Sequence, residues 1–459
     1  MIVVLVLEVV DTAHASVSLA LVTILLSGFM AFWRFNRYGM DPLALFCSIF
    51  LLYDGVLLFR LTTVGDAAVL VYPTTFSTET YSAAGTLCVI AMATVMVTSF
   101  VWESTVEPRR VKQATVLRGT AGRWFWCGFA LYSVGVVLYG LQFQQFGGYF
   151  AALAMQRGEK FEMAGAATLL SYPYLAFVIP GIACMCYGAE CGERRKQRMA
   201  CYGLVGFWCL LVLLQGDRRL VVQAALTVIG ILSVVRPAAL KFRTRTWVLL
   251  AAGYCAFSIF GYARGFISSI ASGQATSSEV LSSIGDDWTS DWLTPEHTEF
   301  AGPYLSLLSA VSEQTQPLFG SSYYESFLTV LPKFMYPGQK PELLTHRFDE
   351  KMHIGHGPIS GWGYNPVAEA YVNFGTAGVA LVFALWAIYF LLIGYVRQRG
   401  VWGTLCGAVL LSEAINANRI DFRNVYWESS YFLAGLVVAA IFNMLFSKLS
   451  RPAPRMNAI

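Results

Sequence analysis

Charged residues are scarce in this chain, and their scarcity excludes a water-soluble fold. Only 13% of the 459 residues are Asp, Glu, Lys or Arg, whereas soluble domains carry roughly 25%. The mean hydropathy is positive, at +0.56. The formal net charge of +4 gives no basic surface of the kind that binds nucleic acid. We therefore expect the chain to lie in a membrane.

Short segments of alternating polar and apolar residues, which would indicate a membrane β-barrel, are also missing. Instead, apolar runs of about 17 to 25 residues recur along the chain, each long enough to cross a hydrocarbon core roughly 30 Å thick. Backbone groups in lipid must bond internally, so we expect helices. The sequence predicts an all-α integral membrane protein with about eleven transmembrane helices. These spans lie near 15–33, 41–61, 81–102, 124–143, 166–187, 199–215, 219–235, 246–265, 368–394, 401–417 and 428–447.

No cysteine lies in the long polar segment 266–365, so a disulfide scaffold is not expected. All ten cysteines fall in apolar spans or short basic loops, which indicates free thiols. A basic region before the first apolar stretch is missing and Glu8 interrupts that stretch. We therefore predict an uncleaved amino terminus, although Ala13-His14-Ala15 is similar to a signal-cleavage site.

The basic loops predict how the chain crosses the membrane. Most of the 32 Lys and Arg residues lie in loops on one side of the expected spans, and the positive-inside rule makes that side cytoplasmic. This orientation places the amino terminus outside and the carboxyl terminus in the cytoplasm. We expect eight transmembrane helices in residues 1–265, a large periplasmic loop in 266–367, and three further helices with a short cytoplasmic tail in 368–459.

Twelve basic residues fall on the outer side, although Lys and Arg are expected on the cytoplasmic side. Their position predicts that they share a function. A single arginine at the membrane edge can snorkel to the headgroups, although its position costs free energy. Five separate loops contribute basic residues at one depth, and guanidinium groups bind phosphate or pyrophosphate bidentately. A shared anionic ligand is therefore expected. The twelve residues are Arg60, Arg157, Lys160, Arg218, Arg219, Arg264, Lys333, Lys340, Arg347, Lys351, Arg419 and Arg423.

The outer segment 266–365 is too long to be a simple connection. Apolar residues such as Trp288 and Trp292 predict amphipathic helices that lie along the membrane surface. Metal binding by histidines three residues apart is disfavoured, because intervening glycines oppose a helix that would align them. The segment holds four of the five histidines, His297, His346, His353 and His356.

Three motifs near the end of this segment give the most specific signal. Residues 331–341 read LPKFMYPGQKP, residues 353–360 read HIGHGPIS, and residues 366–378 read PVAEAYVNFGTAG. This series resembles the Wzy-type O-antigen, or oligosaccharide repeat-unit, polymerase family. The motifs cover residues 331–378, while the layout of spans and outer loop is similar over most of the chain.

The resemblance implies a membrane-embedded glycosyltransferase of the GT-C type in the bacterial inner membrane. Such an enzyme polymerises oligosaccharide repeats linked to undecaprenyl pyrophosphate at the periplasmic face. We expect inversion at the anomeric carbon from a single displacement. We also expect no cofactor or metal, because fixed arginines can offset the charge of the leaving group. Its expected partners are the lipid-linked oligosaccharides and membrane lipids, with a chain-length regulator and a flippase as candidates. An O-antigen ligase-like transferase and a transporter of lipid-linked sugars are the alternatives, although no internal repeat supports a transporter.

Two kinds of site residue are needed, because cations must offset charge on a leaving diphosphate and a base must accept the acceptor proton. Candidate catalytic residues are His356, Glu369 and Arg264. The motif match adds Tyr371 and Asn373 as supporting positions, whereas Arg157 and Arg264 are assigned by topology alone. The predicted pyrophosphate-binding set is Arg157, Arg218, Arg219, Arg264, Lys333, Lys340, Arg419 and Arg423.

Several of these residues also have structural interpretations. Glu369 lies in the first turn of an expected helix, where a carboxylate can cap free amide groups and complement the helix dipole. Lys333 and Lys340 can be ordinary interfacial lysines. The segment 373–375 can serve close packing of helices through small residues.

Overall fold

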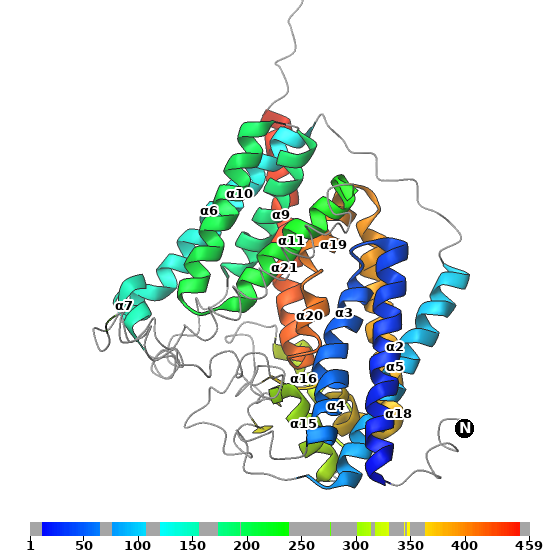
Figure 1. Cartoon of the computed structure of the whole chain (residues 1–459). Helices are drawn as coiled ribbons and strands as arrows, with labels where there is room; N and C mark the ends of the chain where they lie inside the picture. The colour runs from blue at the N-terminus through cyan, green and yellow to red at the C-terminus, as the bar shows by residue number, and fades with distance from the viewer. Residues whose placement is uncertain are drawn as a thin grey trace, which may run out of the picture. The chain divides into compact units, whose positions relative to one another are not determined.

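The protein is helical throughout the part of the chain that the computed structural model describes. No strand occurs among these residues, which confirms the predicted all-α fold class. The chain divides into two compact units, each assembled from separate segments, and Figure 1 shows the helices coloured in chain order. The described residues are 12–64, 76–106, 120–155, 173–192, 194–237, 276, 301–313, 317–329, 344, 347–348 and 363–449.

The first unit comprises Met1–Arg110, Ala275–Tyr395 and Glu413–Trp427. It therefore combines the amino-terminal helices with much of the carboxyl-terminal motif region. Its helices are α2 (Thr12–Tyr38), α3 (Pro42–Phe50), the π-helix η1 (Leu51–Val56), α4 (Leu57–Val64), α5 (Thr78–Thr105), α15 (Ala301–Ser312), α16 (Ser321–Thr329), most of α18 (Pro366–Arg397), α20 (Glu413–Asn416) and the start of α21 (Phe422–Leu449).

The second unit comprises Val111–Gln274, Val396–Ser412 and Glu428–Ile459. Within this unit α6 packs extensively against α9, and α7 and η4 lie between these two helices in the chain. Its helices are α6 (Ala121–Gln142), the 3₁₀-helix η4 (Phe143–Phe146), α7 (Tyr149–Ala154), α9 (Leu175–Cys191), α10 (Arg195–Leu214), α11 (Arg218–Val235), α19 (Gly400–Val409) and the remainder of α21.

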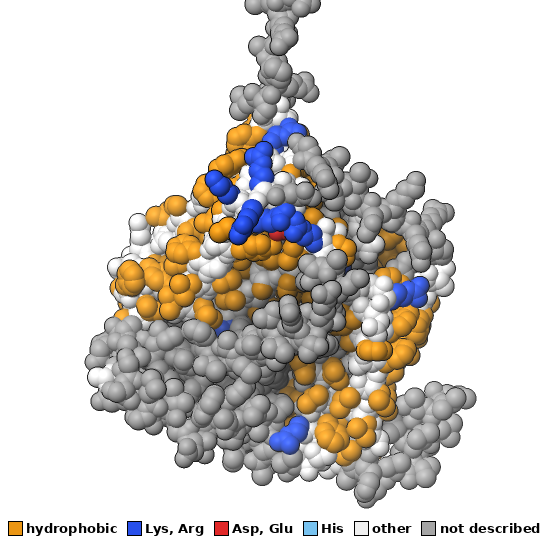
Figure 2. Space-filling view, turned by 45° about the horizontal axis from the view of Figure 1, so that its top comes forward, with side chains coloured by type: hydrophobic (Ala, Val, Ile, Leu, Met, Phe, Trp, Pro, Cys, Tyr) orange, Lys and Arg blue, Asp and Glu red, His pale blue; other side chains and the backbone are white. Residues whose placement is uncertain are grey.

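In the described part of the chain, eight helices are long and apolar enough to cross a membrane. Large apolar side chains stay exposed on them, with Leu25 at 68% and Phe32 at 70% exposure. Hydrophobic side chains also cover much of the described surface in Figure 2. Extended apolar surface of this kind suits a lipid environment, and it supports a multi-pass membrane protein. The eight helices correspond to the spans predicted near 15–33, 41–61, 81–102, 124–143, 199–215, 219–235, 368–394 and 428–447.

The other three predicted spans have different outcomes. The span near 166–187 is represented by α9, which begins at Leu175 and is a shorter apolar helix. The span predicted near 401–417 is interrupted, because α19 ends at Val409 and α20 begins only at Glu413. Polar side chains at 412, 413 and 416 are buried here. The helix is interrupted at these residues because buried polar groups need hydrogen-bond partners. The span 246–265 lies outside the described residues.

The segment predicted as an outer loop contains two described helices, and one of them differs from the prediction. The helix α15 is not an amphipathic surface helix, because every residue from Ala301 to Ala310 is buried. Its apolar residues point in all directions, which is typical of a core helix. It packs against α5 and η1.

A buried ion cluster fixes the corner between α2 and α3. Arg34 donates to Asp41 through Nε at 2.8 Å and to Glu103 through Nη1 at 2.9 Å, and the same Nη1 donates to Ser99. Asp41 also caps α3 by accepting the N–H of Ala44 at 3.0 Å. Because the charges are paired and hydrogen-bonded, their burial is tolerated.

In the second unit, glycines let α6 and α9 approach closely. A Cβ at Gly181 would lie 2.6 Å from the backbone nitrogen of Tyr132, and a Cβ at Gly128 would meet the backbone of Met185 and Gly181. Such small-residue contacts are typical of helices in membranes. The described cysteines are free thiols, as predicted, and Cys255 lies outside the described residues.

Candidate functional site

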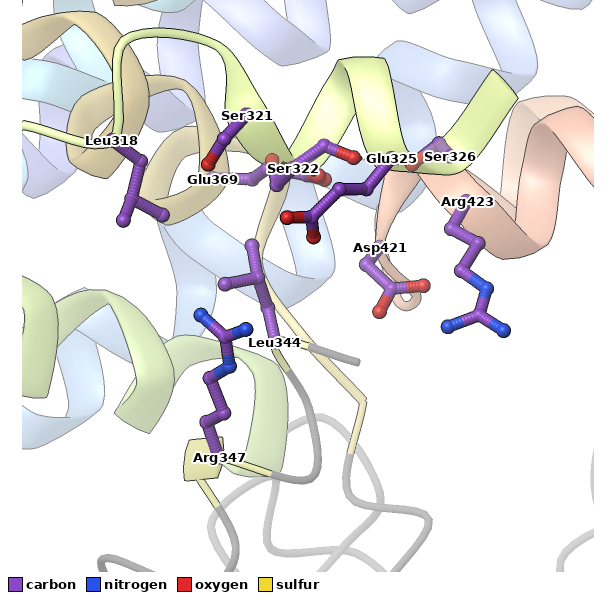
Figure 3. A pocket seen from close by; sticks show the side chains of 10 residues that line it. All are labelled: Leu318, Ser321, Ser322, Glu325, Ser326, Leu344, Arg347, Glu369, Asp421 and Arg423. Atoms are coloured by element: carbon purple, nitrogen blue, oxygen red, sulfur yellow. Dashed lines mark hydrogen bonds between the residues drawn. The ribbon is translucent and has the colours of Figure 1, made fainter. Parts of the chain in front are cut away.

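The first unit contains a pocket that four parts of the chain line. It has about 350 Å³ of empty space, part of which is open. Figure 3 shows side chains from α16, α18, the start of α21 and the region near Leu344 directed toward this space. The lining residues are Leu318, Ser321, Ser322, Glu325, Ser326, Leu344, Arg347, Glu369, Asp421 and Arg423.

The start of α18 is fixed by Asn365, which is fully buried. Its Oδ1 accepts the N–H of Val367 at 2.8 Å and thereby caps the helix. Its Nδ2 donates to Oδ1 of Asp54 at 2.6 Å, and its own N–H is donated to Ser306 Oγ at 2.9 Å. Asp54 lies in the π-helix η1, and insertions of this type are frequent at functional sites. Three segments therefore set the position of Glu369, which lies one turn further along α18.

Glu369 is 3% exposed and both of its carboxylate oxygens accept hydrogen bonds. Ser322 Oγ donates to Oε1 at 3.1 Å, and the backbone N–H of Phe422 donates to Oε2 at 2.8 Å. Asn373 extends the network by donating from Nδ2 to Ser322 Oγ at 2.8 Å and to the Glu369 carbonyl at 2.7 Å. The structural interpretation of Glu369 therefore needs correction: Asn365 caps α18, and Glu369 caps α21.

A break in α18 shapes the same wall of the pocket. Gly375 has φ 68° and ψ −161°, a non-helical conformation inside the helix. Three residues before it, the Val372 carbonyl accepts the N–H of Leu318 at 2.8 Å, which ties the turn before α16 to α18. Phe374 stacks on Tyr323 of α16 with ring centroids 6.0 Å apart. A Cβ at Gly375 would meet nothing within 4 Å, so the predicted close packing at this glycine is wrong and its role is conformational.

The pocket combines carboxylates and guanidinium groups. Glu325, Glu369 and Asp421 line it together with Arg347 and Arg423. In Figure 3 the Glu325 side chain projects from α16 into the space, while the two arginines approach from different segments. Carboxylates can accept protons from hydroxyl groups, and arginines can hold phosphate oxygens. This combination suits transfer from a phosphate-linked donor to a hydroxyl acceptor.

Two tyrosines beside the pocket keep their protons at neutral pH. Burial raises the pKa of Tyr323 well above its ordinary value, and the Glu369 charge raises it further. Burial likewise raises the pKa of Tyr364, with added contributions from the charges of Glu369 and Asp421, while Arg347 acts in the opposite direction. Both phenols are therefore neutral hydroxyl groups rather than phenolates.

The structure brings two of the predicted site residues into the pocket, Glu369 and Arg423. Asn373 is buried behind it, and Tyr371 is half-buried on α18. Arg419 also lies in this unit, where its carbonyl accepts the N–H of Tyr364 at 2.9 Å. The predicted site residues Arg157, Arg264, Lys333, Lys340 and His356 lie outside the described residues.

Arg218 and Arg219 lie in the second unit, at the start of α11. A tight turn precedes them, since Gly216 has φ 79° and Asp217 caps α11 by accepting the N–H of Leu220. Arg219 forms an ion pair with Glu428, which is fully buried. Gln223 donates to the same carboxylate. A structural role for Arg219 is thus visible, whereas its predicted role toward pyrophosphate stays a prediction.

Eight of the ten lining residues were not predicted as site residues: Leu318, Ser321, Ser322, Glu325, Ser326, Leu344, Arg347 and Asp421. A signal for α16 existed, because Ser322, Glu325 and Ser326 share the i, i+3, i+4 spacing that places side chains on one face of a helix. Arg347 was part of the outer basic set but was not assigned to the site.

A family comparison matches the region that forms the pocket. The model of the family described as O-antigen polysaccharide polymerase Wzy matches residues 319–449, less than one third of the chain. This match confirms the resemblance to Wzy-type polymerases and supports O-antigen repeat-unit polymerisation as the general function. All lining residues of the pocket except Leu318 fall inside the matched segment. No curated protein and no solved structure matches the chain.

Proposed function

We propose that the protein joins oligosaccharide repeat units carried on undecaprenyl pyrophosphate, at the periplasmic face of the bacterial inner membrane. The observation that carries the proposal is the coincidence of the charged pocket with the matched family segment. A hydroxyl of one lipid-linked repeat attacks C1 of the sugar on the growing chain. The C1–oxygen bond breaks and undecaprenyl pyrophosphate leaves. A single displacement of this kind inverts the anomeric carbon.

The proposed role of the arginines is to stabilise negative charge on the leaving diphosphate. Fixed guanidinium groups keep their charge at any working pH, and they act most strongly where charge develops in the transition state. Among the residues that the structure describes, Arg423 and Arg347 line the pocket and are candidates for this role. Arg157, Arg264, Lys333 and Lys340 belong to the same proposal, and so do Arg218, Arg219 and Arg419.

The proposal assigns proton acceptance to a side chain near the matched motif. Glu369 and His356 are the candidates from the sequence, and Glu369 lies in the pocket wall. No metal takes part in the proposed reaction. The proposed orientation has the amino terminus outside and the carboxyl terminus in the cytoplasm, in agreement with the basic loops.

The test is an assay with purified protein in lipid and a synthetic lipid-linked repeat. The wild type should give a ladder of products that differ by one repeat, and a chelator should not change it. Arg423→Ala should lower kcat/KM by at least tenfold, with Arg423→Lys only partly active because a lysine cannot bind bidentately. Arg195→Ala, on an exposed stretch of α10, is the control and should match the wild type.

The same assay separates this function from its alternatives. A ligase-like transferase would move a preformed polymer to a different acceptor and would not lengthen the repeat ladder. A transporter would leave the lipid-linked repeat chemically unchanged. If folded wild-type protein left every supplied lipid-linked repeat unchanged, the proposed polymerase would be ruled out.

A further inference from the structure

The three carboxylates of the pocket differ in the hydrogen bonds that their oxygens accept from other residues. Glu369 accepts hydrogen bonds on both oxygens, from Ser322 and from the N–H of Phe422. Asp421 is 2% exposed, and its Oδ1 accepts from Nδ2 of Asn424 at 2.8 Å. These two carboxylates therefore hold the start of α21 and the network around it.

Glu325 has a different environment. Its side chain is half-buried, lines the pocket, and has no hydrogen bond or ion pair to any residue in the described part of the chain. Figure 3 shows its carboxylate directed into the pocket, with Leu344 and Arg347 facing it and Asp421 on another side. No residue in the described part of the chain therefore occupies its lone pairs. A general base needs this availability, since it must lie within hydrogen-bond reach of the proton that it accepts.

Neighbouring residues of α16 hold the backbone around Glu325 in place. On α16, Ser322 lies about one turn before Glu325, and Ser326 follows Glu325 directly. Ser322 is fixed to Glu369 and Asn373, and Ser326 donates to the Ser322 carbonyl at 2.6 Å. Tyr323 of the same helix stacks on Phe374. The backbone that carries Glu325 is therefore held on α18, while its carboxylate remains accessible.

We infer that Glu325 is the catalytic base of the proposed transfer and that Glu369 is a positioning residue, an assignment that rests on the proposed function. The acceptor hydroxyl gives its proton to the Glu325 carboxylate while its oxygen forms the bond to C1. The C1–oxygen bond to the diphosphate breaks, and its electron pair leaves with the diphosphate. Arg347 and Arg423 lie at the same pocket, where they offset the negative charge of that group. Glu325 then returns the proton to water.

The experiment compares Glu325→Gln and Glu325→Asp with the wild type in the repeat-ladder assay. Glu325→Gln keeps the size of the side chain and one acceptor oxygen but removes its basicity. It should lower kcat by at least about 100-fold while KM for the lipid-linked repeat changes less than about threefold. Glu325→Asp keeps the carboxylate at a shorter reach and should retain an intermediate kcat. Glu79→Gln makes the same change at an exposed site in the first turn of α5 and should leave kcat unchanged.

Glu369→Gln separates the two roles. It should lower both the unfolding temperature and the activity, because its oxygens accept two structural hydrogen bonds. Glu325→Gln should not lower the unfolding temperature, since Glu325 holds no such bonds. If Glu325→Gln does not fold, kcat of Glu325→Asp becomes the test. A wild-type kcat in that variant overturns the assignment.

The outcomes also distinguish this inference from the proposed function. A wild type that makes no ladder defeats the proposed function itself. A wild type that makes a ladder, together with a Glu325→Gln variant within about threefold of its kcat, overturns the assignment of Glu325 and leaves the polymerase proposal standing. A selective loss of kcat in Glu369→Gln, with unchanged unfolding temperature and an active Glu325→Gln, would exchange the two roles.

Discussion

Glu369 of α18 caps α21, because its Oε2 accepts the backbone N–H of Phe422 at a distance of 2.8 Å. Phe422 is the first residue of α21, and the first N–H groups of a helix have no acceptor within the helix itself. A carboxylate at this position also complements the positive end of the helix dipole. One side chain thereby joins two segments that are far apart in sequence at the wall of the pocket.

This relationship predicts the effect of removing the carboxylate. Glu369→Ala leaves the Phe422 N–H and the Ser322 hydroxyl without their acceptor, and an unsatisfied buried donor costs about 1–3 kcal/mol. We expect a clearly lower unfolding temperature in detergent or lipid, measured by intrinsic fluorescence. Glu369→Gln should lose less, since its amide oxygen can still accept one bond. An unchanged unfolding temperature in Glu369→Ala would show that the cap contributes nothing to stability.

A second prediction concerns Asp54, which affects the pocket through Asn365. Its Oδ1 accepts from Asn365, the residue that caps α18, and its Oδ2 has no partner in the described part of the chain. Asp54→Ala should destabilise by about 1–3 kcal/mol and lower kcat, because the start of α18 loses its anchor. Asp54→Asn keeps an acceptor oxygen and should be close to the wild type in both measurements. Equal losses in the two variants would instead point to the charge of Asp54.

Sequence reasoning predicted the helical fold because hydrophobic length alone decides it. A run of apolar residues long enough to cross lipid must become a helix, and the described residues form eight such helices. It could not predict the break at Gly375 or the gap between Val409 and Glu413, because both depend on backbone geometry and tertiary partners. That α15 is buried on all sides follows from the direction of its apolar side chains around the helix, which the composition of the outer segment does not show.

The candidate site was predicted in part for similar reasons. Glu369 stands in a recognisable motif, and Arg423 was noticed because a basic residue on the outer side opposes the charge bias. Asp54 gave no signal, because its partner Asn365 is 311 residues away in the chain. Glu325 was missed because the long outer segment was judged by composition, whereas its role follows from the pocket that α16 lines.

The break in α18 gives a third prediction. Gly375 has φ 68° and ψ −161°, a region of backbone conformation that is essentially restricted to glycine, with a cost of order 1–3 kcal/mol for other residues. Since nothing lies within 4 Å of a Cβ there, Gly375→Ala should destabilise through backbone strain alone. We expect a lower unfolding temperature and reduced product formation.

Gly206→Ala is the matched control for this change. Gly206 lies inside α10 without a positive φ, and its Cβ would also meet nothing within 4 Å. Alanine favours a helix over glycine by about 1 kcal/mol, so this variant should be as stable as the wild type or more so. Equal responses of the two variants would show that the conformation of Gly375 is not required.

The last prediction concerns Arg219, which was expected to bind pyrophosphate and which pairs with the buried Glu428. Removing one member of a buried ion pair leaves the other charge uncompensated, whereas replacing both is often close to neutral. Arg219→Gln and Glu428→Gln should therefore each lower the unfolding temperature, and the double variant should recover most of the loss as a measurable coupling. If the pair is structural only, activity should recover with stability in the double variant. If Arg219 also binds the diphosphate, kcat/KM should stay low in the double variant although its unfolding temperature has returned.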